Sequence, residues 1–297
     1  MSLLLRENAK IIGQGITGSE GQRALPWMRA YGTNIVAGVT PGKGGEILDG
    51  VPIFNTVKDA VQAVGQVDGS VMFVPPLFSK GAVTEAMESG IKFVLIGAEK
   101  VPTKDAAIIY SLSRQFGASV LGPSSVGFIS PHNKIKIGAI GGADPSRVFV
   151  DGNVAVISKS GGMTSEISLH LKNNDLGVSY AAGIGGERII CTDFADFLLA
   201  LEDDPMTTAS VIFGELGGTA EERVAELVSE RRIKKKVVAF IAGDFAAVLP
   251  NDVQFGHAGA IIEGRKGTAK EKRRVLREAG VLVAEHFDDI AGLIKKS

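Results

Sequence analysis

The stretch that decides the fold is Lys10-Ile11-Ile12-Gly13-Gln14-Gly15-Ile16-Thr17-Gly18, an apolar run followed by a loop of the form G-x-G-x-x-G. Such a loop stands between a strand and a helix, where glycines let the backbone come close to a phosphate group. The N-terminus of the helix supplies amide donors and a partial positive charge. The stretch therefore predicts a strand–loop–helix unit of the kind that binds nucleotides.

The second predicted strand, Asn34–Val39, runs into Thr40-Pro41-Gly42-Lys43-Gly44-Gly45. A dinucleotide site needs an acidic residue at the end of this strand to bind ribose hydroxyls, and none is present. Lys43 instead favours a ligand with an additional phosphate, such as the 3′-phosphorylated ADP of coenzyme A. NADP satisfies the same requirement, and a structural turn without any ligand stays a further alternative.

Short β-rich runs alternate with amphipathic helical stretches along the whole chain, which predicts α/β architecture with parallel sheets covered on both faces. We expect one α/β domain over residues 1–125, a connecting segment over 126–150 and a second α/β domain over 151–297. Helical patterns lie at Val57–Val64 and Lys104–Phe116, for example. The predicted strands are Lys10–Gly13, Asn34–Val39, Ser70–Val74, Lys92–Ile96, Ala118–Leu121, Asn153–Ser158, Val178–Gly183, Ala209–Gly214, Lys236–Ala242 and Gly280–Ala284.

Composition excludes several classes of protein. The 32 basic and 33 acidic residues are intermixed, so nothing suggests a nucleic acid or a membrane surface as partner. Cys191 is the single cysteine, which excludes an internal disulfide and fits a reducing compartment. No apolar run is long enough to span a membrane. The histidines have no metal-ligand spacing, so we expect no metal site, and we expect a cytoplasmic protein.

A second informative stretch is Gln254-Phe255-Gly256-His257-Ala258-Gly259-Ala260-Ile261-Ile262. His257 stands among small residues, which leaves its imidazole open to attack on a bulky group. An imidazole with its unperturbed pKa of about 6.5 can attack a phosphoryl group at neutral pH without a separate base. The alternative, from this loop alone, is a histidine with an ordinary hydrogen-bonding role.

Taken together, five segments in order along the chain resemble the α subunit of succinyl-CoA synthetase and its relatives. They are Gly13–Gly18, Gly38–Gly45, Gly183–Gly186, Gly214–Gly218 and Gly256–Ala260. The resemblance implies an N-terminal Rossmann-like CoA-binding domain followed by a flavodoxin-like domain that carries the phosphohistidine loop. The family couples nucleoside triphosphate hydrolysis to acyl-CoA formation through a phosphohistidine, so His257 is the residue expected to be phosphorylated.

The resemblance also implies the other site residues. Glu215 matches a glutamate that hydrogen-bonds the catalytic imidazole, and such a carboxylate orients the ring and supports the imidazolium. The loop with Ser160, Gly161 and Gly162 opens a helix whose N-terminus should stabilise the phosphate or contact the acid. The residues that match CoA contacts are Thr17, Gly18, Ser19, Glu20, Lys43, Gly97, Ala98 and Glu99.

Departures from succinyl-CoA synthetases point to one branch of the family. This chain has Gly122-Pro123-Ser124-Ser125-Val126-Gly127 and Ser160-Gly161-Gly162-Met163-Thr164-Ser165, where that enzyme carries a Gly-Pro-Asn-Cys-Pro-Gly loop and a tyrosine at the position of Ser165. The synthetase module of ATP-citrate lyase resembles this chain better in both loops and is identical from Val253 to Ala260. Small residues also make room for a tricarboxylate. We therefore expect a small subunit of the citryl-CoA synthetase type, with a succinyl-CoA or malyl-CoA ligase subunit as the alternative.

The chain lacks an ATP-grasp pattern and a G-x-x-x-x-G-K-[ST] loop. We therefore expect an ATP-grasp large subunit to bring ATP and Mg²⁺, so that the active form is a hetero-oligomer. Two other classes stay open: a non-catalytic CoA-binding regulator and an NADP oxidoreductase. The phosphohistidine apparatus argues against the first, and the lack of a hydride-transfer constellation argues against the second.

Overall fold

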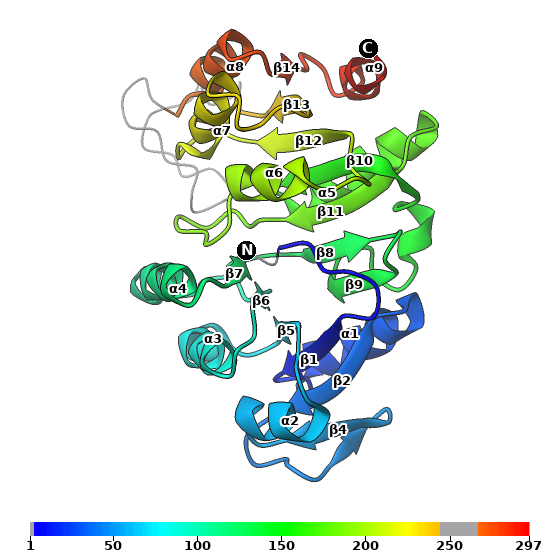
Figure 1. Cartoon of the computed structure of the whole chain (residues 1–297), viewed down its shortest axis with the longest axis vertical. Helices are drawn as coiled ribbons and strands as arrows, with labels where there is room; N and C mark the ends of the chain where they lie inside the picture. The colour runs from blue at the N-terminus through cyan, green and yellow to red at the C-terminus, as the bar shows by residue number, and fades with distance from the viewer. Residues whose placement is uncertain (1–2, 244–266, 297) are drawn as a thin grey trace.

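The glycine-loop stretch forms β1 (Lys10–Gln14), which occupies the centre of a seven-stranded sheet. We describe a computed structural model over residues 3–243 and 267–296 (Figure 1). The order of the sheet is β3-β4-β2-β1-β5-β6-β7, and every adjacent pair is parallel except β3 and β4. The further strands are β2 (Asn34–Val39), β3 (Ile47–Leu48), β4 (Val51–Phe54), β5 (Gly69–Met72), β6 (Phe93–Ile96) and β7 (Ser119–Leu121).

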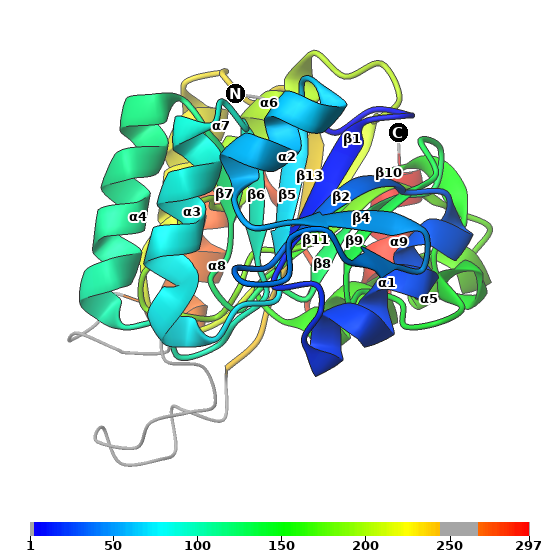
Figure 2. The ribbon, with the colours of Figure 1, turned by 90° about the horizontal axis from the view of Figure 1, so that it is seen from below.

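The helices of this half follow their strands and end at recognisable signals. The Thr56 side chain caps α2 by accepting a hydrogen bond from the Asp59 amide, and Gly117 ends α4 in the left-handed conformation. Figure 2 shows α2, α3 and α4 on one side of the sheet and α1 on the other, where α1 packs against the later strand β9 (Ile135–Gly138). The helices are α1 (Ser19–Tyr31), α2 (Val57–Val64), α3 (Ser79–Glu88) and α4 (Thr103–Phe116), and a 3₁₀ turn, Pro76–Phe78, precedes α3.

A second seven-stranded sheet has the order β14-β13-β12-β10-β11-β8-β9. Its central strands are parallel and almost wholly buried, which explains their continuous apolar sequences. β8 runs antiparallel to β11, and β9 antiparallel to β8. The remaining strands are β8 (Gly127–Ser130), β10 (Asp151–Ser158), β11 (Val178–Gly183), β12 (Ala209–Gly214), β13 (Lys236–Ile241) and β14 (Leu282–Val283).

Helices cover both faces of the second sheet: α5 and α9 lie on one side and α6, α7 and α8 on the other (Figure 1). Asp193 and Asp196 form a reciprocal capping box at the start of α6, which satisfies amides that the helix itself leaves unpaired. The helices are α5 (Gly161–Asn173), α6 (Phe194–Glu202), α7 (Ala220–Ser229), α8 (Ala269–Glu278) and α9 (Asp289–Lys295), and a 3₁₀ turn, Pro145–Arg147, precedes β10.

The structure confirms the predicted α/β class and places a strand at or within one or two residues of each predicted position. Two hairpins, β3–β4 and β8–β9, were not among the predicted strands. The β8–β9 hairpin lies within the segment 126–150 that the sequence analysis assigned as a connector, and it extends the second sheet. The division into domains stays a prediction. Among the described residues, no helix combines the length and the apolar character needed to cross a membrane.

Each sheet has a point at which the direction of winding reverses, between β1 and β5 in the first and between β10 and β12 in the second. Ligands of doubly wound sheets bind outside the carboxyl ends of the strands at such points. In this chain the carboxyl ends of β1 and β5 lead to Gly15 and Phe73, and those of β10 and β12 lead to Lys159 and Glu215. The topology therefore selects these loops as candidate sites.

Candidate functional site

A cavity of about 770 Å³, the first cavity, lies at the switch point of the first sheet. Gly15 makes the turn out of β1 with a positive φ of 70°, and a Cβ atom there would lie 2.9 Å from the carbonyl oxygen of Phe73. The loop therefore closes on the chain after β5 and forms the floor of the cavity. The lining residues are Gln14, Gly15, Thr17, Gly18, Ser19, Glu20, Val39, Thr40, Pro41, Lys43, Phe73, Val74, Pro75, Phe78, Gly81, Ala82 and Glu85.

A second cavity, of about 590 Å³, lies between the two sheets and shares Glu20 and the Phe73–Pro75 loop with the first. One wall follows β6 and the other is the start of α5 in the second half of the chain. A ligand long enough to run through both cavities would reach from the first glycine loop to α5. The lining residues are Glu20, Met72, Phe73, Val74, Pro75, Pro76, Gly97, Ala98, Glu99, Ser124, Ser125, Val126, Ala139, Lys159, Gly161 and Gly162.

The structure brings most of the predicted site residues to these two cavities. The first cavity collects Thr17, Gly18, Ser19, Glu20 and Lys43. The second cavity collects Glu20 with Gly97, Ala98 and Glu99, and places them opposite Gly161 and Gly162. The Lys43 ammonium is well exposed and lies 3.7 Å from the Glu46 carboxylate, so it is free to turn toward an anionic ligand. The roles of these residues stay predictions.

The loop with Ser160, Gly161 and Gly162 opens α5, and its contact with a phosphate or an acid stays a prediction. The Ser160 side chain accepts a hydrogen bond of 3.4 Å from the Met163 amide and so caps the helix. A Cβ atom on Gly161 would lie 2.8 Å from the Val126 side chain, whereas one on Gly162 would meet, among the described residues, only the Ser160 hydroxyl, at 3.9 Å. Gly161 is therefore required for packing, and Gly162 borders open space in the second cavity.

Few of the described residues that line the second cavity are charged. Glu20 and Glu99 are its acidic lining residues, and Lys159 is the cation among them. Lys159 stands between β10 and α5, its ammonium is 2.8 Å from Glu221 Oε1, and it lies 5.8 Å from the ring centre of Phe194. Lys159 was not among the predicted site residues. Its position beside the α5 terminus makes it a candidate for contact with an anionic substrate.

Glu215 directly follows β12, at the switch point of the second sheet. Its amide donates a hydrogen bond of 3.3 Å to Glu221 Oε1, and its carbonyl accepts one of 2.9 Å from Lys272 Nζ. Burial alone would raise the pKa of Glu221, but Lys159 and Lys272 together hold that pKa below its usual value. Burial lowers the pKa of Lys272, and Glu221 opposes this effect. This cluster was not predicted, because no local pattern links Lys159, Glu221 and Lys272.

His257, the predicted phosphoryl carrier, and the rest of Gln254–Ile262 lie outside the described residues. The structure brings Lys159, the α5 terminus and the Glu215 backbone together at the carboxyl end of the second sheet. The hydrogen bond expected between Glu215 and His257 stays a prediction.

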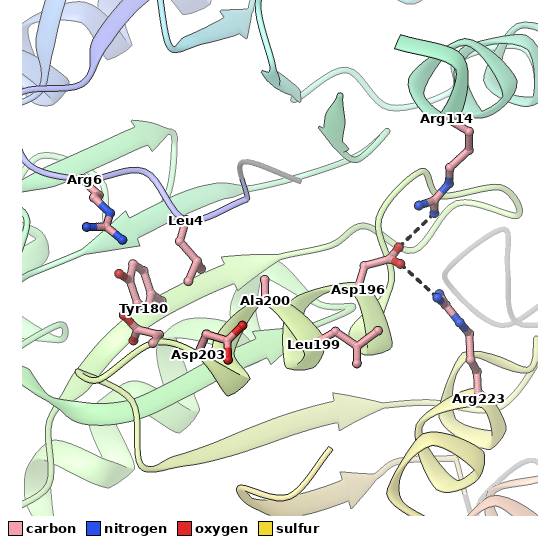
Figure 3. Close-up of a pocket in the computed structure, with 10 residues that line it drawn as sticks. Leu4, Arg6, Arg114, Tyr180, Asp196, Leu199, Ala200, Asp203 and Arg223 are labelled. Carbon is pink, nitrogen blue, oxygen red and sulfur yellow. Dashed lines mark hydrogen bonds and ion pairs between the residues drawn. The ribbon is translucent and has the colours of Figure 1, made fainter. Parts of the chain in front are cut away.

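A third cavity, of about 640 Å³, lies beside α6, and none of the predicted site residues that the structure describes lines it (Figure 3). Asp196 accepts hydrogen bonds from Arg114 at 3.0 Å and from Arg223 at 3.1 Å, and Arg223 also bonds Asp193 at 2.7 Å. Arg114 belongs to α4 in the first half of the chain, whereas its partner belongs to α6. The ion pair between Arg114 and Asp196 thus joins the two halves of the chain.

Two family models match this chain. The model described as "CoA binding domain" matches residues 6–100, and the one described as "Succinyl-CoA ligase like flavodoxin domain" matches residues 151–295. The α subunit 1 of ADP-forming succinate–CoA ligase from Archaeoglobus fulgidus is 41% identical over 296 residues, which are 100% of this chain and 98% of that protein. The ADP-forming sulfoacetate-CoA ligase subunit SqwL from Acholeplasma is 38% identical, over 100% of this chain and 98% of that protein.

Among solved structures, ATP citrate lyase from Methanothrix soehngenii, in complex with citrate and coenzyme A, superposes with a TM-score of 0.90 at 28% identity. The match covers 99% of this chain and 50% of that one, so this chain spans half the length of that lyase. A dinucleotide-forming acetyl-coenzyme A synthetase from Candidatus Korarchaeum cryptofilum shares the fold, with a TM-score of 0.73 at 20% identity.

Proposed function

This chain belongs to the family of succinate–CoA ligase α subunits, which are subunits of ADP-forming acid–thiol ligases, and on that premise we propose that it is the α-type subunit of a ligase that forms citryl-CoA. The reaction is ATP + citrate + CoA to ADP + phosphate + citryl-CoA. An ATP-grasp large subunit would hold ATP and Mg²⁺, so the active species would be a hetero-oligomer.

The observation that carries the choice of citrate is the open space at the start of α5. Within the described part of the chain, a Cβ atom on Gly162 would have only the Ser160 hydroxyl within 4 Å, and Ser165 stands where succinyl-CoA synthetases have a tyrosine. A citrate ion is larger and carries more charge than succinate, so it needs both the added space and a positive environment. The α5 terminus and Lys159 provide such an environment next to that space.

In the proposed mechanism, His257 attacks the γ-phosphorus of ATP on the partner subunit, and ADP leaves. Glu215 orients the imidazole and supports its positive charge. A citrate carboxylate oxygen then attacks the phosphorus of the phosphohistidine, which frees the imidazole and forms citryl phosphate at the α5 terminus. The CoA thiol attacks the activated carbonyl, loses its proton and expels inorganic phosphate. The phosphohistidine thus divides one difficult condensation into separate transfers.

The two cavities suit the delivery of CoA in this mechanism. Thr17, Gly18, Ser19 and Lys43 would bind the phosphorylated nucleotide end in the first cavity. The shared Phe73–Pro75 loop would guide the remainder of the molecule past Gly97–Glu99 into the second cavity. The thiol would then arrive beside Gly161 and Gly162, where the acyl phosphate forms.

Succinate is the second candidate, because the relative with 41% identity over this whole chain is named a succinate–CoA ligase subunit. Sulfoacetate is tested as well, because a relative that is 38% identical to this chain is named a sulfoacetate-CoA ligase subunit. The test is to co-express the chain with its ATP-grasp partner and to measure CoA- and ATP-dependent phosphate release with citrate, succinate, malate and sulfoacetate in parallel. We expect citrate to give the highest kcat/KM. A higher kcat/KM with any other acid would refute citrate as the substrate and leave the family assignment unchanged.

A further inference from the structure

Three charged side chains, Lys159, Glu221 and Lys272, meet beneath the loop that follows β12, and we call them the buried ion triplet. Lys159 Nζ is 2.8 Å from Glu221 Oε1, and Lys272 Nζ is 2.5 Å from Glu221 Oε2. The side chains of Glu221 and Lys272 are fully buried, and that of Lys159 is 10% exposed. The three come from separate parts of the chain: the β10–α5 loop, α7 and α8.

Burying the charged groups of the triplet costs free energy of folding. Removing an ion from water costs several kcal/mol even after relaxation, and apolar side chains of similar volume often stabilise a core at least as well. The two lysines and one glutamate also leave one uncompensated positive charge in the triplet itself. Stability alone is therefore a poor explanation, and the contacts of the triplet suggest a different one.

The first set of contacts fixes the backbone of the Gly214–Gly218 loop. Glu221 Oε1 accepts from the Glu215 amide at 3.3 Å, and Lys272 Nζ donates to the carbonyls of Glu215 at 2.9 Å and Gly217 at 2.5 Å. A Cβ atom on Gly214 would lie 2.5 Å from Glu221 Oε1, so the carboxylate lies directly under the loop. The position from which the Glu215 side chain extends is thus set by Glu221 and Lys272.

The second set of contacts fixes the cation of the second cavity. Lys159 lines that cavity with Gly161 and Gly162, and the same Glu221 oxygen that accepts from the Glu215 amide holds its ammonium. One buried carboxylate therefore ties the Glu215 backbone to the positive charge beside the α5 terminus. None of the three triplet residues lines the first cavity.

We propose that Glu221 is a positioning residue for phosphoryl transfer, which through the buried ion triplet fixes the Glu215 backbone and the Lys159 ammonium at the carboxyl end of the second sheet. The inference rests on the proposed function, which assigns Glu215 and the second cavity to that transfer. A displacement of about 1 Å in such a site can lower a rate about 100-fold. Because the first cavity, to which we assign the nucleotide end of CoA, contains no triplet residue, the KM for CoA should change little.

The principal test is Glu221→Gln in the complex with the ATP-grasp subunit, with Glu226→Gln as the matched control because Glu226 is exposed on the same helix, α7. Gln keeps the shape of the side chain but removes the charge that holds both lysines. We expect kcat to fall about 100-fold in Glu221→Gln, with the KM for CoA changed less than about two-fold. The control should match the wild type in both constants.

A second variant covers the case in which Glu221→Gln does not fold. Lys159→Met keeps the one-to-one pair of Glu221 and Lys272, so the interior charges balance. Because it removes the cation from the second cavity, we expect kcat to fall at least about 10-fold while the KM for CoA is kept. A kcat within about two-fold of the control in this variant, or an equal loss of kcat and CoA affinity in either variant, would overturn the inference.

Hydrogen exchange of the Gly214–Gly218 amides tests the positioning without any assay of turnover. We expect faster exchange in Glu221→Gln than in Glu226→Gln, because the Glu215 amide loses its charged acceptor. Unchanged exchange would overturn the inference alone. A wild-type complex without ligase activity toward any acid would instead overturn the proposed function, and the two failures are therefore distinguishable.

Discussion

Lys136 allows a quantitative test of how much a buried ammonium lowers the free energy of unfolding. It lies on β9 with its side chain fully buried, and its ammonium has no hydrogen-bond partner within the described part of the chain. The ring of Trp27 on α1 lies 5.6 Å from the ammonium, and Thr33 bonds both backbone groups of Lys136. Burial lowers the pKa of Lys136 from 10.5 to about 8.

The perturbation is Lys136→Met, which keeps the length of the side chain and removes the charge. The lysine binds its proton less tightly in the folded state than in the unfolded state. Burial of the charged ammonium therefore lowers the free energy of unfolding in full below pH 8, and this penalty disappears above pH 10.5. The penalty is about 3 kcal/mol at pH 7 and about 2 kcal/mol at pH 9. The cation–π contact with Trp27 offsets ~1 kcal/mol of it. We therefore expect the variant to be more stable by about 2 kcal/mol at pH 7.

The assay is urea unfolding of the isolated chain at pH 7 and pH 9, with Lys104→Met, an exposed position on α4, as the control. The stability advantage of Lys136→Met should shrink by about 1 kcal/mol between these pH values, because the wild type gains stability as Lys136 loses its proton. The control should show no such change. An advantage that is absent at pH 7, or that grows with pH, would refute the reasoning.

Three further predictions follow from the site and the core. Lys43→Ala should raise the KM for CoA about 10-fold and leave phosphorylation by ATP unchanged, since Lys43 lines the first cavity and not the second. Steady-state kinetics with varied CoA measure this KM, and an unchanged value would remove Lys43 from the site. Ser165→Tyr should lower kcat/KM for citrate more than for succinate, because it refills the space beside the α5 terminus; equal losses in competition assays would show that this position does not select the acid. Cys191 is buried and its pKa is raised to about 12, so a thiol reagent at pH 8 should label the unfolded chain but not the folded one, and rapid labelling of the folded chain would contradict its burial.

The architecture could be predicted because its signals are local. Buried parallel strands are short apolar runs, and the loops that follow them carry glycines that the backbone requires, such as Gly15 with its positive φ. The hairpins β3–β4 and β8–β9 could not be predicted in the same way. Their strands have two to four residues, β4 contains Pro52, and β8 begins and β9 ends at a glycine, so their pairing depends on contacts with the rest of each sheet.

The candidate site shows the same division. The glycine loops predicted where ligands bind, and two cavities lie at those loops. The roles of individual residues came from the resemblance, because the loops alone are compatible with several ligands. Lys272 could not be identified from the sequence, because it lies in the charged stretch Ala269–Glu278, where most of the charges are solvated. Only the fold shows that this one lysine turns inward to meet Glu221. A long-range ion pair between α7 and α8 has no local signal.

The central claim is that this chain carries the phosphoryl group between ATP and the acid. The most direct measurement is to incubate the co-expressed complex with γ-labelled ATP and Mg²⁺ and to look for acid-labile, alkali-stable label on this subunit. We predict that the label forms on the wild type, is discharged by citrate together with CoA, and is absent in His257→Ala. Label that persists in His257→Ala, or full turnover by that variant, would contradict the account.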